Sequence, residues 1–283
     1  MNPLHWLVPW ELSLSIIIVT VITAIVFIRG SLICRLFFRQ KLCFWVGFLS
    51  MYIVSHTQTD YYAAHEFFVH QLQSLVLHSL GPFFIVLSCP KDALTAGFPM
   101  TGKRLIRMVS RWKPMHWLIK VLFHPLVVVL IFVGLSIFWL IPSIHFIAML
   151  DWRVYRLMNW SMALNGLMFW SVVLNSHSFW SPGFRIAIML VVVPPQILIG
   201  AIIFFTPHDL YPIYSLCGRA FTGMSTVTDQ QIGGLILWMH GAMMSVIGIL
   251  IVIHKELRQP EGVLGGTPPG KTLPDKPGKA DGP

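Results

Sequence analysis

Histidines recur on one face of a predicted membrane helix. Glu66, His70, Ser74 and His78 follow one another at intervals of four residues, and Gln73 lies beside them. Residues four apart lie on neighbouring turns of a helix, so these side chains share one slowly turning face. Ionisable residues inside a membrane span are costly and tend to mark function. The stripe, and His70 and His78 above all, is therefore a candidate for contact with a metal ion or a haem.

Another histidine lies in the last apolar segment, which opens on an acid and two amides. These polar residues are Asp229, Gln230 and Gln231, and we single them out as functional candidates at the outer mouth. Thr228 and Gln231 have the T-x-x-Q spacing of a capping box, which predicts that the helix begins there. His240 follows Asp229 by eleven residues, which places it within about 20° of the same face and ~16 Å deeper.

Two imidazoles on different helices can hold a metal ion or ligate a haem axially. His78 lies ~18 Å below the start of its own helix, a depth similar to that of His240. Met243 and Met244 follow His240 by three and four residues, and thioether with imidazole suits copper(I). Two plainer roles remain open. Methionine commonly fills gaps in apolar cores, and an intramembrane histidine can simply hydrogen-bond between helices.

A third polar group lies near the fifth apolar segment. His145 and Asp151 are expected in a short outer loop, and Asn159 and Asn165 on the helix that follows. Hydrogen bonds between packed helices are the favoured role for this group. The sequence has no HExxH, P-loop or GxSxG motif, and no spacing of Ser and His that indicates a catalytic triad. We therefore do not expect an enzyme.

The composition identifies the elements that must position these residues as membrane helices. Of the 283 residues, 55% are hydrophobic and only 11% are charged, where a soluble domain has roughly 25% charged residues. Several apolar runs reach about 20 residues, the length that crosses a bilayer. The net charge of +9 fits basic loops facing the cytoplasm, and no motif suggests a nucleic-acid partner.

Seven apolar segments predict an all-α bundle, because lipid-exposed backbone must satisfy its own hydrogen bonds. They are 12–28, 42–56, 67–89, 122–141, 157–175, 186–205 and 232–253. Of the 20 Lys and Arg residues, seventeen fall in the segments on one side of this arrangement and three on the other. Basic residues favour the cytoplasmic side. The sequence therefore predicts the N-terminus outside and the C-terminus in the cytoplasm.

Two segments are not expected to span the membrane. Residues 104–120 alternate Arg and Lys with Trp, Ile and Met, which is typical of a basic amphipathic helix lying on the inner surface of the bilayer. Residues 259–283 are rich in Pro and Gly, which predicts a disordered cytoplasmic tail. The domain organisation is thus a transmembrane domain over 1–258 and a tail over 259–283.

Three blocks resemble the multi-spanning CtaG-type family of cytochrome c oxidase assembly factors. The blocks are LYPIYSLCGRAFTGMSTVTDQQIGGLILWMHG at 210–241, HQLQSLVLHSLGPFFIVLSCP at 70–90 and GLMFWSVVL at 166–174. The likeness covers roughly residues 10 to 255. It implies a bacterial inner-membrane protein that helps to build haem-copper oxidase by aiding copper delivery from the periplasmic side. The implied partners are the oxidase subunits, the lipid bilayer and a periplasmic copper chaperone.

The chain departs from the family pattern at positions where histidine is usual. Those positions hold Ser74, Leu140, Tyr155 and Asn159. His145, His78 and His240 are candidates to replace the missing ligands. Two alternatives therefore remain open besides copper delivery. One is a haem-binding electron carrier with His78 and His240 as axial ligands, and the other is a metal-free scaffold, transporter or subunit of a respiratory complex.

Overall fold

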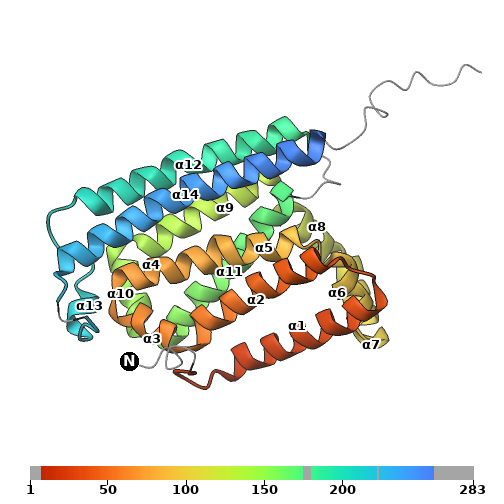
Figure 1. The fold of residues 1–283 in the computed structure, drawn as a ribbon, viewed down its shortest axis with the longest axis horizontal. Helices are drawn as coiled ribbons and strands as arrows, with labels where there is room; N and C mark the ends of the chain where they lie inside the picture. The colour runs from red at the N-terminus through yellow and green to blue at the C-terminus, as the bar shows by residue number, and fades with distance from the viewer. Residues whose placement is uncertain (1–7, 175–179, 222, 258–283) are drawn as a thin grey trace, which may run out of the picture.

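The computed structural model describes residues 8–174, 180–221 and 223–257, and the regular structure in these ranges is helical (Figure 1). An isolated bridge joins Pro9 to Thr57. The helices are α1 (Leu14–Ile33), α2 (Phe38–His56), α3 (Gln58–His65), α4 (Phe67–Leu75), the π-helical turn η2 (Val76–Leu80), α5 (Gly81–Leu87), α6 (Lys91–Gly97), α7 (Met100–Arg111), α8 (Lys113–Leu122), α9 (Pro125–Leu140), α10 (Pro142–Leu150), α11 (Trp152–Leu174), α12 (Pro182–Phe205), α13 (Ile213–Leu216) and α14 (Thr226–Leu257).

Four of these helices are long and apolar enough to cross a membrane, namely α1, α11, α12 and α14. The number rises to six if each of two bent helix pairs counts as one span. One pair joins 67–87 to α6 with a bend of 81°, and the other joins α8 to α9 with a bend of 69°. The chain is therefore an all-α membrane protein with four to six candidate spans among the described residues.

Helices cover most of each predicted apolar segment within the described residues, yet not all of these segments qualify as spans. The helix α2 has 19 residues but is not among the candidates, and its first turn carries Arg39 and Lys41. The helix α9 has only 16 residues, because Pro125 takes its first position. His124 lies just before it in an extended conformation, as proline disfavours a helical residue at the preceding position.

Proline also breaks the predicted amphipathic helix over 104–120. The structure has two helices there, α7 and α8, and Trp112 between them is extended. Pro114 lies in the first turn of α8, where its missing N–H is harmless. Inside a single continuous helix the same residue would remove a hydrogen bond and clash with the preceding turn. The prediction of one helix was therefore wrong, although both pieces carry basic residues.

The most extensive helix pairing is that of α12 with α14, which run side by side along the bundle (Figure 1). Gly200 on α12 faces Gly234 on α14, and a Cβ built on either would lie 2.8 Å from the backbone of the other helix. Small residues of this kind let membrane helices approach closely. This pairing fixes the position of α14, the helix that carries Asp229 and His240.

The two ends of the bundle differ in charge. The basic helices α7 and α8 lie at the same end as the start of α12 and the end of α14, whereas α3, α10 and α13 lie at the opposite end (Figure 1). Arg185 at the start of α12 pairs with Glu256 at the end of α14, at 3.1 Å. The predicted tail, residues 259–283, lies outside the described residues.

Candidate functional site

A small closed cavity brings the predicted histidine stripe together. His70 and His78 reach it from α4 and η2, and His240 reaches it from α14. Its volume is about 20 Å³, which suffices for one water molecule or one ion. The other lining residues are Gln71, Ser74, Leu75, Ser136, Trp139, Leu140, Met158, Met162 and Leu237. We call this space the histidine cavity.

A local break in helical geometry positions His78. His78 lies in the π-helical turn η2, between α4 and α5. Pro82 follows four residues later and has no N–H to donate to the His78 carbonyl, so the regular α-helical pattern cannot continue there. Gly166 on α11 packs against that carbonyl, and a Cβ at Gly166 would overlap it. Single π turns within α-helices are frequent at functional sites.

Neighbouring helices hold both deep histidines. The His78 ring stacks on Phe132, with ring centroids 3.9 Å apart, and its Nε2 lies 3.3 Å from the amide nitrogen of Asn165. The Nε2 atom of His240 lies 2.7 Å from the hydroxyl of Ser79. Both rings are buried, with 1% of His78 and 8% of His240 exposed. These contacts orient the imidazoles before any ligand arrives.

The cavity also contains polar atoms that have no protein partner. The Nδ1 atom of His70 and the Nε2 atom of Gln71 are buried and make no hydrogen bond within the described part of the chain. Buried polar groups are satisfied in the great majority of cases. A water molecule in the histidine cavity would give both atoms a partner, whereas a cation could be bound only by the His70 nitrogen.

His145 lies beside the cavity and not in its wall. It was expected in an outer loop, but it lies on α10 and is fully buried. Its ring centroid is 5.0 Å from that of His70. Both of its nitrogens are engaged, Nδ1 by the Trp139 carbonyl at 3.0 Å and Nε2 by the Tyr214 hydroxyl at 2.9 Å. His145 thus supports His70 and has no free nitrogen for a ligand in this conformation.

The thioethers near the histidines come from a different helix than the sequence suggested. Met243 is 57% exposed on the outside of α14, and Met244 packs in a separate apolar cluster with Val192 and Trp170. Met158 and Met162 of α11 line the histidine cavity instead and are buried. Their spacing of four residues places both on one helix face. That spacing was visible in the sequence, but the neighbour relation between α11 and α14 was not.

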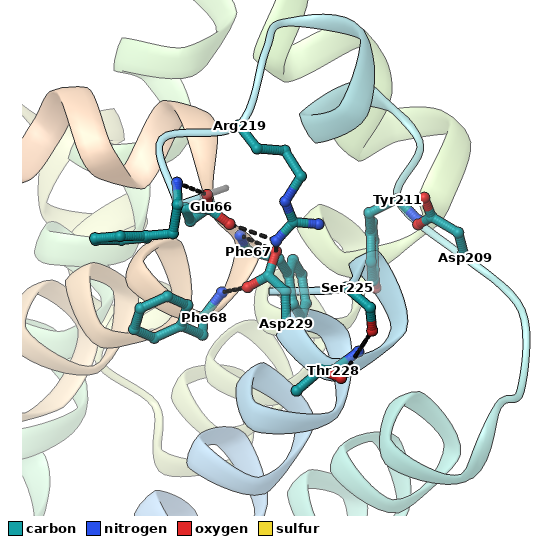
Figure 2. A network of polar contacts seen from close by, with 10 residues as sticks. Glu66, Phe67, Phe68, Asp209, Tyr211, Arg219, Ser225, Thr228 and Asp229 are labelled. Carbon is teal, nitrogen blue, oxygen red and sulfur yellow. Dashed lines mark hydrogen bonds and ion pairs between the residues drawn. The ribbon is translucent and has the colours of Figure 1, made fainter. Parts of the chain in front are cut away.

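An ion network joins the start of α4 to the start of α14 (Figure 2). Asp229 accepts hydrogen bonds from the first two backbone N–H groups of α4, those of Phe67 at 2.9 Å and Phe68 at 2.8 Å. Its carboxylate also pairs with Arg219 at 3.0 Å. Arg219 in turn pairs with Glu66, which accepts a further bond from the Phe221 N–H at 2.8 Å. The network joins α4, α14 and the 217–225 loop.

The residues beside Asp229 also have structural partners. The Gln230 side chain accepts from the Leu210 N–H at 2.7 Å and donates to the Ile203 carbonyl at 3.0 Å, which fixes the loop after α12. Gln231 is half-buried on α14. The helix begins at Thr226, and the Ser225 hydroxyl accepts from the Thr228 N–H at 3.1 Å. The predicted capping box at Thr228 and Gln231 was therefore wrong, because Ser225 caps the helix.

Gln73 points away from the histidine cavity into a second polar cluster. Its amide nitrogen donates to Asp60 at 2.7 Å and to the Val54 carbonyl at 2.7 Å. The Tyr155 hydroxyl lies 2.8 Å from the same Asp60 oxygen. Burial raises the pKa of Asp60, which lies on the short helix α3, to about 6. No spacing in the sequence indicated that Asp60 and Tyr155 lie beside Gln73, because the three residues are on different helices.

The histidine cavity fits a small soft cation better than a haem. Imidazole and thioether are donors that suit copper(I). Among the described residues, no group of three or more His, Cys, Asp or Glu side chains could hold a metal ion. The three histidines therefore do not form a metal site by themselves, and Met158 and Met162 are the other soft donors that line the cavity. A ligand as large as haem needs a pocket of roughly 300–1,000 Å³. The cavity between His78 and His240 measures about 20 Å³, so these residues do not fit a haem in this conformation.

Comparison with known proteins gives one match. A family model described as cytochrome c oxidase caa3 assembly factor (Caa3_CtaG) matches residues 25–259. Comparisons with curated protein sequences and with solved structures found no match. The matched range contains the whole histidine cavity and the ion network above it.

Proposed function

The chain belongs to the cytochrome c oxidase caa3 assembly factor family, and from this premise we propose that it holds copper(I) in the histidine cavity on the way to the oxidase. The observation that carries the proposal is the convergence of His70, His78 and His240 with Met158 and Met162 on one water-sized space. Imidazole and thioether together form a donor set that suits copper(I).

Copper reaches the cavity from the outer end in this proposal. The basic end of the bundle faces the cytoplasm, which places the N-terminus and the ion network of Glu66, Arg219 and Asp229 on the periplasmic side of a bacterial inner membrane. Seven helices then cross or enter the bilayer, with α2 and the bent pairs included. His70 lies nearest to the outer end of α4 and is the first ligand on the path.

The cavity transfers its cargo by exchange of ligands, without covalent chemistry. The Nδ1 atom of His70 has no protein partner to release, so it can accept an incoming ion at little cost. His78 contacts Asn165 at 3.3 Å and His240 contacts Ser79 at 2.7 Å, and these contacts have to give way to the metal. An oxidase subunit docked alongside then removes the ion, and a periplasmic copper chaperone supplies it. The protein is an assembly factor and not an enzyme in this scheme.

Copper(I) titration of the detergent-purified protein against a competing chelator tests the proposal. We expect one copper(I) per chain in the wild type. His70→Ala and the double variant His78→Ala/His240→Ala should lose it. His116→Ala is the matched control, because His116 is exposed on α8, remote from the cavity by its place in the fold. Equal binding by all four proteins would overturn the proposal.

A scaffold without metal is the second candidate, and one observation favours it. Ser74 and Leu140 line the histidine cavity, and both occupy positions where the family pattern usually has histidine. With two potential ligands replaced, the cavity would hold only water. Folded wild-type protein that binds no copper(I) yet still supports oxidase assembly would favour the scaffold.

A further inference from the structure

A second and much larger cavity runs between α1, α2 and α11, and it has no part in the proposed copper path. Its volume is about 1,300 Å³. It follows α11 from Trp152 to Leu174, a length of ~33 Å at the helical rise. Apolar side chains line its middle, among them Val19, Phe48 and Leu164. We call this space the α1–α11 groove.

The outer end of the groove is polar and carries both signs of charge. Arg156, Glu11 and Asp60 line it there. Arg156 pairs with Glu11 at 3.3 Å, and both side chains retain access to solvent. The Arg156 guanidinium also lies 4.9 Å from the Trp152 ring centroid. Trp10 lines the same end, and tryptophan is enriched where a membrane protein meets the lipid headgroups.

Asp60 makes no direct ion pair among the described residues, although Arg156 lies near enough to lower the pKa of its carboxyl. One oxygen of its carboxylate accepts from two neutral donors, the Tyr155 hydroxyl and the Gln73 amide. The raised pKa of Asp60 shows that the surroundings disfavour the charged form. An ammonium group in the groove would supply the missing positive charge.

The contacts at both ends of α1 favour lipid acyl chains as the occupant of the groove. At its outer end the segment before α1 is tied to 56–58, where the Trp10 N–H donates to the His56 carbonyl at 3.3 Å and the Gln58 N–H to the Val8 carbonyl at 3.1 Å. At its inner end Gly30 packs against the backbone of Ala93 on α6. These contacts hold α1 in place at both ends, which favours flexible acyl chains over a helix about 10 Å wide with its side chains.

We infer that the α1–α11 groove binds an outer-leaflet phospholipid whose headgroup carries a phosphate and a primary ammonium. Arg156 binds the phosphate, Asp60 and Glu11 face the ammonium, and the acyl chains run along the apolar middle. The site is independent of the copper proposal, since none of these three residues lines the histidine cavity.

Lipid retention by the full chain tests the inference. Protein equilibrated with vesicles of equal phosphatidylethanolamine and phosphatidylglycerol content is analysed by native mass spectrometry. We expect the wild type to retain one phosphatidylethanolamine, preferred roughly tenfold, as for a charge-assisted hydrogen bond. Asp60→Asn keeps the acceptor oxygen for Tyr155 and Gln73, so it should lose only this preference. Arg156→Gln should lose both lipids.

The matched control is Arg153→Gln, because Arg153 is an exposed neighbour that does not line the groove. It should behave as the wild type. Equal retention of both lipids by the wild type, or an unchanged preference in Asp60→Asn and Arg156→Gln, would overturn the inference. A photoreactive residue at Leu164, which lines the groove and is 57% exposed, should label lipid in cells. Labelling of a protein segment at this position would show that the groove is occupied by a docked helix and not by a lipid.

Discussion

At the scale of single residues, the methionines test whether copper(I) in the histidine cavity is bound by imidazole and thioether together or by the imidazoles alone. Met158→Leu/Met162→Leu preserves apolar volume and removes both thioethers, so we expect copper(I) binding to weaken roughly tenfold or more, the effect of losing about 1.4 kcal/mol. Met243→Leu should have no effect, because Met243 lies on the outside of α14. A chelator competition assay measures both. Unchanged affinity in the double variant would leave the imidazoles as the only ligands.

Asp60 supplies a prediction about pH in delipidated protein. Burial raises its pKa from 3.8 to about 6, partly opposed by hydrogen bonds from Tyr155 and Gln73; Glu11 raises the pKa further and Arg156 lowers it. A raised pKa means that folding favours the protonated form. The resulting stability is fully present below about pH 4 and is lost as the pH rises through about 6. The loss amounts to about 1–3 kcal/mol.

Thermal unfolding of delipidated wild type and Asp60→Asn at several pH values measures this effect. The variant stays neutral, so its stability should not fall between pH 4 and 7 as that of the wild type does. Phosphatidylethanolamine should remove the difference by providing an ammonium partner. A parallel pH dependence of the two proteins would exclude Asp60 as its source.

The arrangement of site residues within one helix could be predicted from the sequence, whereas their contacts with other helices could not. The four-residue spacing of Glu66, His70, Ser74 and His78 predicted a shared face, because periodicity within a helix is a local property. The last three line the histidine cavity, whereas Glu66 does not. Met158, Met162 and Tyr155 could not be assigned to their partners, because they lie on α11 and the order of helices in a bundle is set by packing between distant segments. For the same reason the sequence placed Asp229 near the start of its helix without indicating that Arg219 lies beside it.

At the scale of elements, the ion network fixes the outer loop over the histidine cavity. Arg219→Gln would leave Glu66 and Asp229 as two buried carboxylates without a cation. We expect the free energy of unfolding to fall by about 3–5 kcal/mol, the usual effect of breaking a buried ion pair from one side. Thermal unfolding in detergent measures it, with the exposed Arg153→Gln as control.

Neutralising Glu66, one of the two carboxylates left without a cation, should restore part of the lost free energy of unfolding. Arg219→Gln/Glu66→Gln is therefore expected to be more stable than Arg219→Gln alone. If both variants and the control unfold together with the wild type, the network does not hold the loop.

The helices themselves were predictable, but their interruptions were not. Long apolar runs determine α1, α11, α12 and α14 directly. The breaks arise at Pro82, at Pro114 just after Trp112, and at Pro125, where proline removes one backbone donor. Whether a proline bends a helix, introduces a π turn or ends the helix depends on its neighbours. The His78 carbonyl, to which Pro82 cannot donate, packs against Gly166, a contact between helices that sequence spacing does not reveal.

At the scale of the whole molecule, the bundle keeps the proposed copper site apart from the proposed lipid site. The histidine cavity lies among α4, η2, α9, α11 and α14, and the groove lies on the other side of α11 between α1 and α2. The α12 and α14 pair forms a rigid side of the bundle, whereas only 17% of the apolar window of α1 is buried. An assembly factor organised in this way can hold its cargo inside and meet lipid or client protein along the α1 side.

The most direct test of the account is the metal content of the oxidase that this protein helps to build. The oxidase is purified from cells lacking the chain and complemented with wild type, His70→Ala/His240→Ala or His116→Ala, each shown to be present at equal level. The account predicts full copper with the wild type and the control, and an oxidase with haem but little copper with the double variant. A fully copper-loaded oxidase from the double variant would contradict it.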